Sequence, residues 1–350
     1  MAPSDRSPIH ILVIRFSALG DVAMTVPVLR ALLQQHPEVH ITVLTRGFFK
    51  PLFSQLENVT VFEADLKGKH KGPFGLWKLY TELKARGLDG VADLHNVLRT
   101  NVLRYYFQLG GIPFFQLDKA RRDKKVLTAL KNKVFKPLKS THQRYADVFA
   151  EMDLPLDLSK VSLYSKEKLF DSILKHIGRE PKKWVGIAPF AAHEGKMYPL
   201  ALMKKVIELL GSTQRYKLLL FGGGKKEQAA LENLAETDSN CIVIAEKLSL
   251  HEELALISNL DLMLSMDSAN GHLAAMYDIP VVTLWGVTHP YAGFAPFGQD
   301  LNNSLLADRT KYPLIPTSIY GNKIPRGYET VMETISAEAV VTKIKEVLGD

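Results

Sequence analysis

The chain of 350 residues is 46% apolar and has a formal net charge of +7 at pH 7. This length favours two domains, because a single hydrophobic core rarely grows so large. A single cysteine, Cys241, excludes an internal disulfide and, with no secretory signal recognisable, indicates a reducing cytoplasm. No apolar run reaches the length of a membrane-spanning helix, which excludes an integral membrane protein of the helical kind.

Residues 1–165 predict strands that alternate with helices. Short apolar, β-branched runs typical of strands occur at 10–16, 39–45, 58–63 and 87–95. Helical spacing of apolar residues occupies 19–36, 72–87 and 97–110. Pro27 falls inside the first of these helices and predicts a kink there.

The second half of the chain restarts this alternation. Strands are expected at 183–190, 216–223, 241–246, 260–266 and 279–286, with helices at 199–212, 224–237, 249–260 and 268–278. Continuous apolar strands between amphipathic helices indicate parallel sheets covered on both faces. We therefore expect an α/β protein of two doubly wound domains, 1–165 and 166–350. A final helix at 336–349 fits either the second domain or a return onto the first.

The segment RFSALGDV places Asp21 just beyond the first expected strand. In doubly wound sheets, ligands bind beyond the carboxyl ends of the strands, where loops lead into helices. A carboxylate in the first turn of a helix is commonly a cap that the helix dipole favours. Facing a ligand, Asp21 would also act as a general base, and the two roles are compatible.

The segment DSANGH at 267–272 has the same position in the second domain. Asp267 and Ser268 follow a strand and open a helix, whose first N–H groups lack internal partners and attract anions. The alternative is that either residue only caps the helix, and that His272 is an ordinary helical histidine.

Two further loops of the second domain carry candidate ligands. Lys196, in HEGKMYP after a strand, suits a phosphate group, although many such lysines are simply solvated. The Gly-rich turn FGGGKKE at 221–227 lacks both the P-loop spacing and the dinucleotide fingerprint. Its Glu227 suits the hydroxyls of a ribose, or is a first-turn acid that the dipole favours.

Positive charge is concentrated in the first half of the chain, where 24 Lys and Arg stand against 15 Asp and Glu in residues 1–165. The stretch 119–144 alone has ten basic residues and one acid. Few aromatic residues interrupt it, so stacking on nucleic acid bases is not indicated. It is either a solvated basic face or a surface for anionic lipid or sugar.

Several chemistries lack their motifs. No cysteine–histidine cluster, HxxxH pair or DxD-like pair in a loop indicates a metal site, and no G-x-S-x-G element indicates a serine hydrolase.

The loop DLHNVLRTN at 93–101, with His95 and Arg99, offers polar groups at another strand end. There, Asp93 is either a cap or a ligand contact.

Three of these motifs together resemble the lipopolysaccharide heptosyltransferases, glycosyltransferase family nine. RFSALGDV at 15–22 followed by TVPVLR at 25–30 is similar to the family's N-terminal signature. DSANGHLAA at 267–275 followed by PVVTLWGVTHP at 280–290 is similar to its C-terminal signature. KMYP at 196–199 matches its Lys-x-aromatic-Pro element, and all three stand in the family's order.

The resemblance implies the GT-B fold, in which two facing Rossmann-like domains enclose a cleft. It implies an inverting, metal-independent transfer of heptose from ADP-heptose to the inner core of lipopolysaccharide, with no cofactor. By position, Asp21 matches the catalytic base. The matching donor-binding residues are Lys196, Glu227, Asp267, Ser268, Ala269 and His272. The acceptor contacts implied in the same way are Ser17, Asp93, His95, Arg99, Arg121 and Arg122.

Two departures concern the donor. Ala269 stands where the family usually has glycine, and its methyl group narrows or shifts the approach of the backbone to the diphosphate. Asn270 and Gly271 stand where the family often has Pro-Met or a similar pair. The alternatives are therefore a related enzyme with another nucleotide sugar or surface-glycan acceptor, or a non-catalytic nucleotide- or glycan-binding protein. A lipid-linked anionic acceptor predicts an enzyme in the cytoplasm, at the inner face of the inner membrane and without a nucleic acid partner. The acceptor sugar, the linkage and the oligomeric state stay open.

Overall fold

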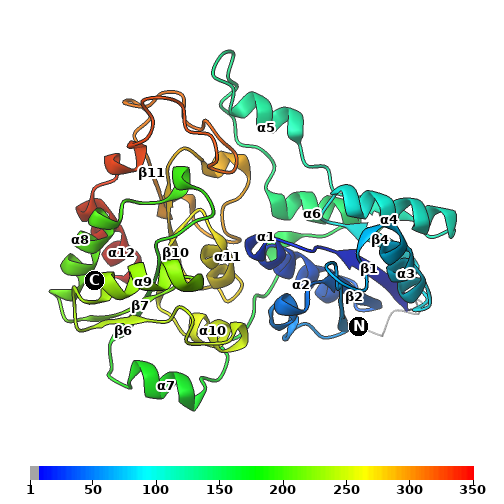
Figure 1. Cartoon of the computed structure of the whole chain (residues 1–350), viewed down its shortest axis with the longest axis horizontal. Coiled ribbons are helices and arrows are strands. Elements are labelled where there is room, and N and C mark those ends of the chain that lie inside the picture. Colours follow the sequence, from blue (N-terminus) through cyan, green and yellow to red (C-terminus); the bar gives the residue numbers. More distant parts are fainter. Residues whose placement is uncertain (1–7) are drawn as a thin grey trace. The chain divides into compact units, whose positions relative to one another are not determined.

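The computed structural model describes residues 8–350 and divides the chain into two compact units, each built on a parallel β-sheet (Figure 1). Unit 1 comprises the residues up to Lys119 and Thr141–Leu163, and unit 2 comprises Ala120–Ser140 and Tyr164–Asp350. Between residues 8 and 350, no helix is both long and apolar enough to cross a bilayer.

The sheet of unit 1 has the strand order β3-β2-β1-β4-β5, with every pair parallel. Its strands are β1 Ile9–Ile14, β2 Val39–Thr45, β3 Val59–Glu63, β4 Gly90–Asp93 and β5 Phe114–Gln116. Its helices are α1 Leu19–Ala23, α2 Thr25–Gln35, α3 Gly72–Lys84, α4 Leu98–Leu109 and α6 Thr141–Ala150, with the 3₁₀ turns η1 Gly47–Phe53 and η2 Leu158–Lys160. The strand order reverses at β1, so this strand and β4 end side by side at the place where such sheets bind ligands.

The expected first helix is divided into two. α1 ends at Ala23, and α2 begins at Thr25 after Met24. Pro27 therefore lies in the first turn of α2, where its missing N–H is not needed for a helical hydrogen bond. The predicted kink at Pro27 is replaced by a break between the two helices at Met24.

The sheet of unit 2 has the order β11-β10-β9-β6-β7-β8, also parallel throughout. Its strands are β6 Lys183–Ala188, β7 Tyr216–Leu220, β8 Cys241–Val243, β9 Leu262–Met266, β10 Val281–Trp285 and β11 Ser304–Leu306. Its helices are α5 Arg121–Leu127, α7 Asp171–Ile177, α8 Leu200–Gly211, α9 Gly224–Ala235, α10 Leu250–Ile257, α11 Ala269–Ala275 and α12 Ala337–Leu348. Its 3₁₀ turns are η3 Glu194–Lys196, η4 Pro290–Ala292, η5 Leu301–Asn303 and η6 Val331–Thr334.

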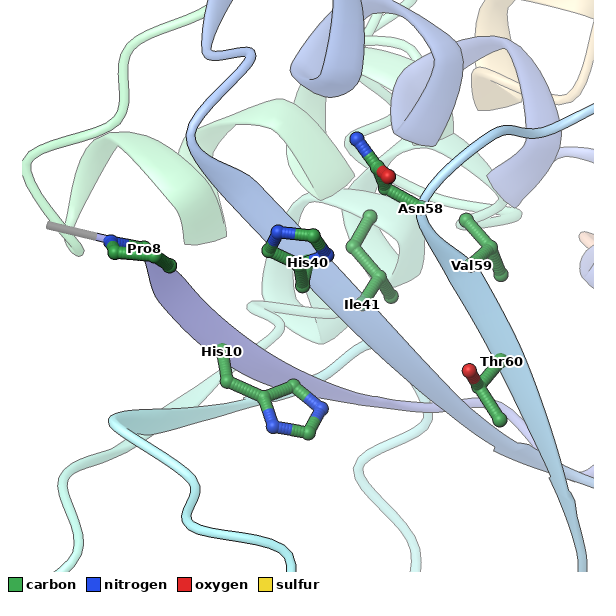
Figure 2. Close-up of a pocket in the computed structure, with 7 residues that line it drawn as sticks. All are labelled: Pro8, His10, His40, Ile41, Asn58, Val59 and Thr60. Carbon is green, nitrogen blue, oxygen red and sulfur yellow. The ribbon is translucent and has the colours of Figure 1, made fainter.

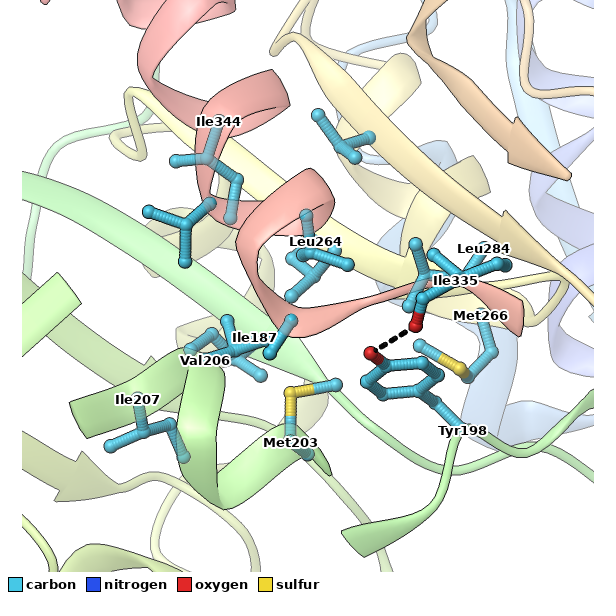
Figure 3. Packing of buried hydrophobic residues seen from close by; sticks show 14 of the residues in the cluster. Ile187, Tyr198, Met203, Val206, Ile207, Leu264, Met266, Leu284, Ile335 and Ile344 are labelled. Carbon is cyan, nitrogen blue, oxygen red and sulfur yellow. Dashed lines mark hydrogen bonds between the residues drawn. The ribbon is translucent and has the colours of Figure 1, made fainter. Parts of the chain in front are cut away.

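The final helix, α12, belongs to the core of unit 2 (Figure 3). Its Ile344 joins a buried cluster with Ile187 of β6, Met203 of α8 and Leu264 of β9. Tyr198 lies in the same cluster, and its hydroxyl donates to the carbonyl of Ile335 over 2.7 Å. The alternative in which this helix returns to the first domain is therefore wrong.

Residues 120–140 group with unit 2 rather than with the rest of the first half. Leu127 packs with Ala292 and Ile319, and the N–H of Leu138 donates to the carbonyl of Tyr291 over 2.9 Å. The sequence predicts a single domain boundary at residue 165, and the structure departs from it by assigning residues 120–140 to unit 2. The chain therefore passes between the units three times.

Candidate functional site

The turn between β1 and α1 carries Asp21 on a buried arginine. Arg15 is only 7% exposed; its Nη2 lies 2.6 Å from Oδ2 of Asp21, and its Nη1 donates to the carbonyl of Leu94 over 2.6 Å. The N–H of Ala18 also donates to Oδ2 of Asp21, over 3.3 Å. Among the described residues no donor reaches the other oxygen, Oδ1, and the Asp21 side chain is 32% exposed. The carboxylate is thus held by one oxygen and open at the other.

Asp21 is therefore both a cap and a candidate base. It is the third residue of α1, and its bond to the Ala18 N–H is the carboxylate half of a capping box. The Tyr145 hydroxyl donates to the Asp21 carbonyl over 3.4 Å, and burial raises the pKa of this phenol well above its usual range. Tyr145 therefore stays neutral and supports the turn from α6.

His95 lies beside this carboxylate because β4 is the neighbour of β1. Burial and the charges of Arg15 and Lys119 lower the pKa of His95 to about 3. The imidazole is therefore neutral at physiological pH, and its Nδ1 accepts a long bond of 3.5 Å from the N–H of Phe16. A neutral ring can hydrogen-bond a sugar hydroxyl without a competing charge.

Asp93 is fully buried and holds the turn that carries His95. Its Oδ1 accepts from the N–H groups of His95 over 2.9 Å and Asn96 over 3.0 Å, and its Oδ2 accepts from the Gln116 amide over 2.8 Å. Asp93 does not cap α4, because that helix begins at Leu98 after the N-cap Val97; its Oδ1 instead closes the turn that precedes the helix. Asp93 thus positions His95 and does not itself face solvent.

The other expected acceptor contacts are divided between the units. Ser17 is half-buried in the β1–α1 turn and Arg99 is exposed in the first turn of α4, both in unit 1. Arg121 and Arg122 are exposed at the start of α5, which belongs to unit 2. Unit 1 therefore carries Ser17, Asp21, His95 and Arg99, whereas the two arginines of α5 belong to unit 2.

In unit 2, Lys196 and Asp267 form a nearly buried ion pair. The Lys196 Nζ lies 2.8 Å from Oδ2 of Asp267 and donates to its backbone carbonyl over 3.1 Å. An ammonium has three N–H groups, so one is left for a further acceptor. The aliphatic stem of Lys196 crosses Gly321, where an added Cβ would lie 2.5 Å from Cγ of the lysine. Gly321 has a φ of 79°, and the sequence motifs did not single it out as a neighbour of Lys196.

The start of α11 differs from a simple cap. Ser268 makes no side-chain cap bond; its hydroxyl lies 3.1 Å from that of Ser265, which accepts from the N–H of Gly271 over 3.2 Å. Ala269 opens this seven-residue helix, and His272 is buried within it. Ser265, at the end of β9, takes the capping role that the sequence suggested for Ser268.

Glu227 is half-buried in the first turn of α9. Its Oε2 accepts from the N–H of Gly223 over 2.9 Å, so the first-turn acid expected from the sequence is present. The bond commits one carboxylate oxygen, and a ribose contact would use the other.

A pocket of about 470 Å³ lies elsewhere in unit 1, between the amino ends of β1, β2 and β3 (Figure 2). Its His10 is already engaged, with Nε2 at 2.9 Å from the Thr42 hydroxyl and Nδ1 at 3.2 Å from the Arg86 carbonyl. This end of the sheet is opposite to Asp21 and His95, so the pocket is separate from the candidate base.

Comparison with known proteins gives the family. A sequence model described as glycosyltransferase family 9 (heptosyltransferase) matches residues 76–317. The lipooligosaccharide heptosyltransferase 2 of Haemophilus influenzae is 29% identical over 310 residues, covering 80% of this chain and 84% of that protein. The lipopolysaccharide core heptosyltransferase OpsX of the same organism is 24% identical over 292 residues, 81% of each chain.

Solved structures show the same fold. A glycosyltransferase family 9 protein from Veillonella parvula superposes with a TM-score of 0.76 at 20% identity and covers 98% of both chains. The ADP-heptose lipopolysaccharide heptosyltransferase II of Escherichia coli gives a TM-score of 0.69 at 19% identity, covering 97% of this chain and 98% of that one. These likenesses and the two parallel-sheet units confirm the expected GT-B class. The chain belongs to glycosyltransferase family 9, the heptosyltransferases, and is a glycosyltransferase.

Proposed function

We propose that this enzyme transfers heptose from ADP-heptose to the inner core of lipopolysaccharide, by inversion and without a metal ion. The observation that carries the proposal is the Asp21 carboxylate, held by Arg15 through Oδ2 and open at Oδ1. A sugar hydroxyl is a weak nucleophile at neutral pH, and a positioned base speeds its attack by roughly 10²–10⁴-fold. Oδ1 of Asp21 takes the hydroxyl proton as the acceptor oxygen bonds to the anomeric carbon.

Of the two described carboxylates at the ends of β1 and β4, Asp21 is the one with an uncommitted oxygen, and this supports inversion. Retention by double displacement needs a second group that attacks the anomeric carbon. The nearby Asp93 is fully buried and has both oxygens engaged. One displacement, with Asp21 as base, inverts the anomeric configuration once.

The donor is assigned to unit 2. As the anomeric bond breaks, negative charge grows on the departing diphosphate, and Lys196 offers its remaining N–H to it. Glu227 accepts from the ribose with its uncommitted oxygen, and Asp267, Ser268, Ala269 and His272 line the nucleotide sugar. The acceptor contacts proposed for unit 1 are Ser17, His95 and Arg99, with Asp93 behind them. Arg121 and Arg122 are proposed to reach anionic groups of the acceptor from unit 2.

The test is a transfer assay with purified enzyme and lipid-linked core acceptor. ADP-heptose is compared with other ADP-, UDP- and GDP-sugars, and the product linkage is determined by NMR. We expect turnover with ADP-heptose, an inverted anomeric centre, unchanged activity in EDTA and loss of at least about 100-fold in Asp21→Ala. Preference for another nucleotide sugar would overturn the assignment of the donor, and a retained anomeric configuration would overturn inversion. Loss of activity in EDTA that Mg²⁺ restores would overturn the metal-free mechanism. Nucleotide binding without turnover would leave a non-catalytic protein.

A further inference from the structure

Two neighbouring helices of unit 1 expose large apolar side chains. On α3, Phe74 is 92% and Trp77 is 49% exposed; on α4, the exposed fractions are 81% for Leu98, 69% for Tyr105 and 85% for Leu109. We call these five residues the aromatic face. Leu98, Tyr105 and Leu109 follow each other by seven and four positions, so they form one stripe along α4.

The two helices form a single surface. The Trp77 ring packs edge-on against Tyr106 of α4 at 5.1 Å between centroids, and the Tyr106 hydroxyl lies 3.4 Å from the carbonyl of Pro73, where α3 begins. The opposite sides of the helices bury Leu76, Leu79 and Leu83 of α3 and Leu103 and Phe107 of α4 in the unit 1 core. The core is therefore complete without the aromatic face, and folding does not account for these side chains.

Basic residues surround the aromatic face with few acids to balance them. α4 has two arginines and no acid, and its Arg99 and Arg104 are both exposed. The exposed basic residues on α3, on α4 and beside them are Lys67, Lys69, Lys71, Lys78, Lys84, Arg86, Arg99 and Arg104. Against these eight cations stand Glu82 of α3, which pairs with Lys69 at 2.9 Å, and the exposed Asp65 and Asp89 beside the helices. The partner that fits this surface is apolar inside and anionic at its boundary.

We propose that the aromatic face docks on the surface of a bilayer that contains anionic lipid. Trp, Tyr and Phe side chains settle at the boundary between headgroups and acyl chains, while lysine and arginine meet anionic headgroups. A second copy of this chain would set one basic rim against another, which like-charge repulsion opposes. The inference deepens the proposed function and rests on its lipid-linked acceptor, because docking would bring unit 1 to the acceptor's membrane.

The aromatic face is distinct from the basic stretch at 119–144, for which the sequence offers a surface for anionic lipid as one of two alternatives. In that stretch, Lys133 donates to the carbonyls of Leu127, Leu314 and Pro316, and Lys124 lies 4.4 Å from the Phe294 ring centroid. These two cations serve the fold of unit 2. The α3–α4 surface joins exposed aromatics and exposed cations on regular helices.

Fluorescence quenching locates the contact. The other two tryptophans are buried Trp285 and half-buried Trp184, so Trp77 is the most exposed of the three. The full chain is mixed with phosphatidylcholine vesicles with or without 30% phosphatidylglycerol, whose acyl chains carry bromine. We expect binding and quenching only with the anionic vesicles. Trp77→Phe, which keeps an aromatic ring, should lose most of the quenching and little of the binding.

Substitutions then separate this surface from its rivals. Phe74→Ser with Leu109→Ser, and separately Lys78→Glu with Arg104→Glu, should each weaken sedimentation with anionic vesicles at least tenfold without changing the melting temperature. Leu301→Ser, at a residue similarly exposed on unit 2, is the matched control and should bind normally. Both double variants should transfer heptose normally to a delipidated, soluble acceptor.

Four results would overturn the docking proposal. These are no binding to anionic vesicles, equal binding to neutral vesicles, unchanged binding by both double variants, and a concentration-dependent dimer that Phe74→Ser with Leu109→Ser abolishes. A fifth result, binding lost on neutralising Lys125, Lys131 and Lys136, would also overturn it by placing the contact on residues 120–140. A wild-type chain that docks but transfers no heptose would disprove the proposed function and leave docking in place.

Discussion

Arg15 and Asp21 show how one carboxylate serves both the fold and the proposed reaction. Its Oδ2 closes the first turn of α1 and meets the guanidinium, and its Oδ1 stays open. Arg15 is in turn fixed by the Leu94 carbonyl at the end of β4. The same guanidinium thus orients the proposed base and ties together the two strand ends that carry Asp21 and His95.

His95 makes a testable contribution to stability. Its pKa in the folded protein, about 3, lies below the ordinary histidine value near 6.5, because burial and the charges of Arg15 and Lys119 disfavour the cation. Between these two values the unfolded chain binds more protons than the folded one. Titration of His95 should therefore leave the free energy of unfolding unchanged above about pH 6.5. Below that pH, it should lower the free energy of unfolding by at most about 1.4 kcal/mol per pH unit as the pH drops towards 3.

Urea unfolding of the wild type and of His95→Asn between pH 7.5 and 5 measures this effect. The wild type should lose stability more steeply with falling pH than the variant, which lacks the titrating ring. Equal slopes would show that His95 is protonated as readily in the folded protein as in the unfolded chain.

At the scale of elements, the half-buried ammonium of Lys133 joins the apolar contacts of Leu127 in holding residues 120–140 to the rest of unit 2. The Lys133 Nζ donates to the carbonyls of Leu127 over 3.0 Å, Leu314 over 2.7 Å and Pro316 over 2.5 Å. Burial and the charge of Arg309 lower the pKa of Lys133 to about 8, so it is still mostly charged at neutral pH. Its bonds join this segment to a loop almost two hundred residues later in the chain.

Lys133→Met should therefore loosen residues 120–140. Leaving these partly buried carbonyls without a donor costs up to about 1–3 kcal/mol, and hydrogen exchange of the α5 amides should rise accordingly while β1 and β6 stay protected. Lys131→Met removes the same charge from an exposed position two residues earlier and should leave the exchange unchanged. The same acceleration in both variants would mean that charge, and not the three carbonyl bonds, retains the segment.

At the scale of the whole molecule, the proposed base and the proposed phosphate contact lie on different units. Lys196→Ala should weaken ADP binding about 10–100-fold, as expected for loss of a charge-assisted hydrogen bond. Asp21→Ala should leave ADP affinity within a few-fold of the wild type while it abolishes transfer. Calorimetric titration with ADP measures the affinity of both variants. Lys204→Ala is the control for loss of a lysine in unit 2, because Lys204 is exposed on α8.

Normal ADP affinity in Lys196→Ala would remove this lysine from the donor site. Because the substitution also leaves Asp267 buried without its cation, Lys196→Arg is measured in parallel. Partial recovery of ADP binding in that variant would confirm the need for positive charge at this position.

The division into units also changes where the charge lies. Unit 2 gains eight basic residues and one acid with residues 120–140, and the two units then carry net charges of about +2 and +5. The basic excess that the sequence places in its first half therefore belongs mostly to unit 2. Within unit 1, the α3–α4 surface is a local concentration of positive charge in a nearly balanced unit.

The sequence by itself determined the alternation of strands and helices, the α/β class, the family, and the placing of Asp21, Asp267 and Lys196 at strand ends. These features depend on local periodicity and on short motifs, which residues close together in the chain establish. The three-residue β5 and β11, the seven-residue α5 and α7 and the ten-residue α6 were missed, because short segments display little periodicity.

Only the tertiary structure decided what each polar residue contacts. The pairing of β4 with β1 placed Arg15 against the Leu94 carbonyl, and the residues around Asp93 left it buried as a support for His95. The carbonyls of the loop at 314–316 bind the Lys133 ammonium, so this lysine is not part of a free basic surface. The packing of α3 on α4 places Phe74, Trp77 and Leu109 on one exposed surface. Burial and partnership depend on contacts between residues distant in the chain, and no local pattern records them.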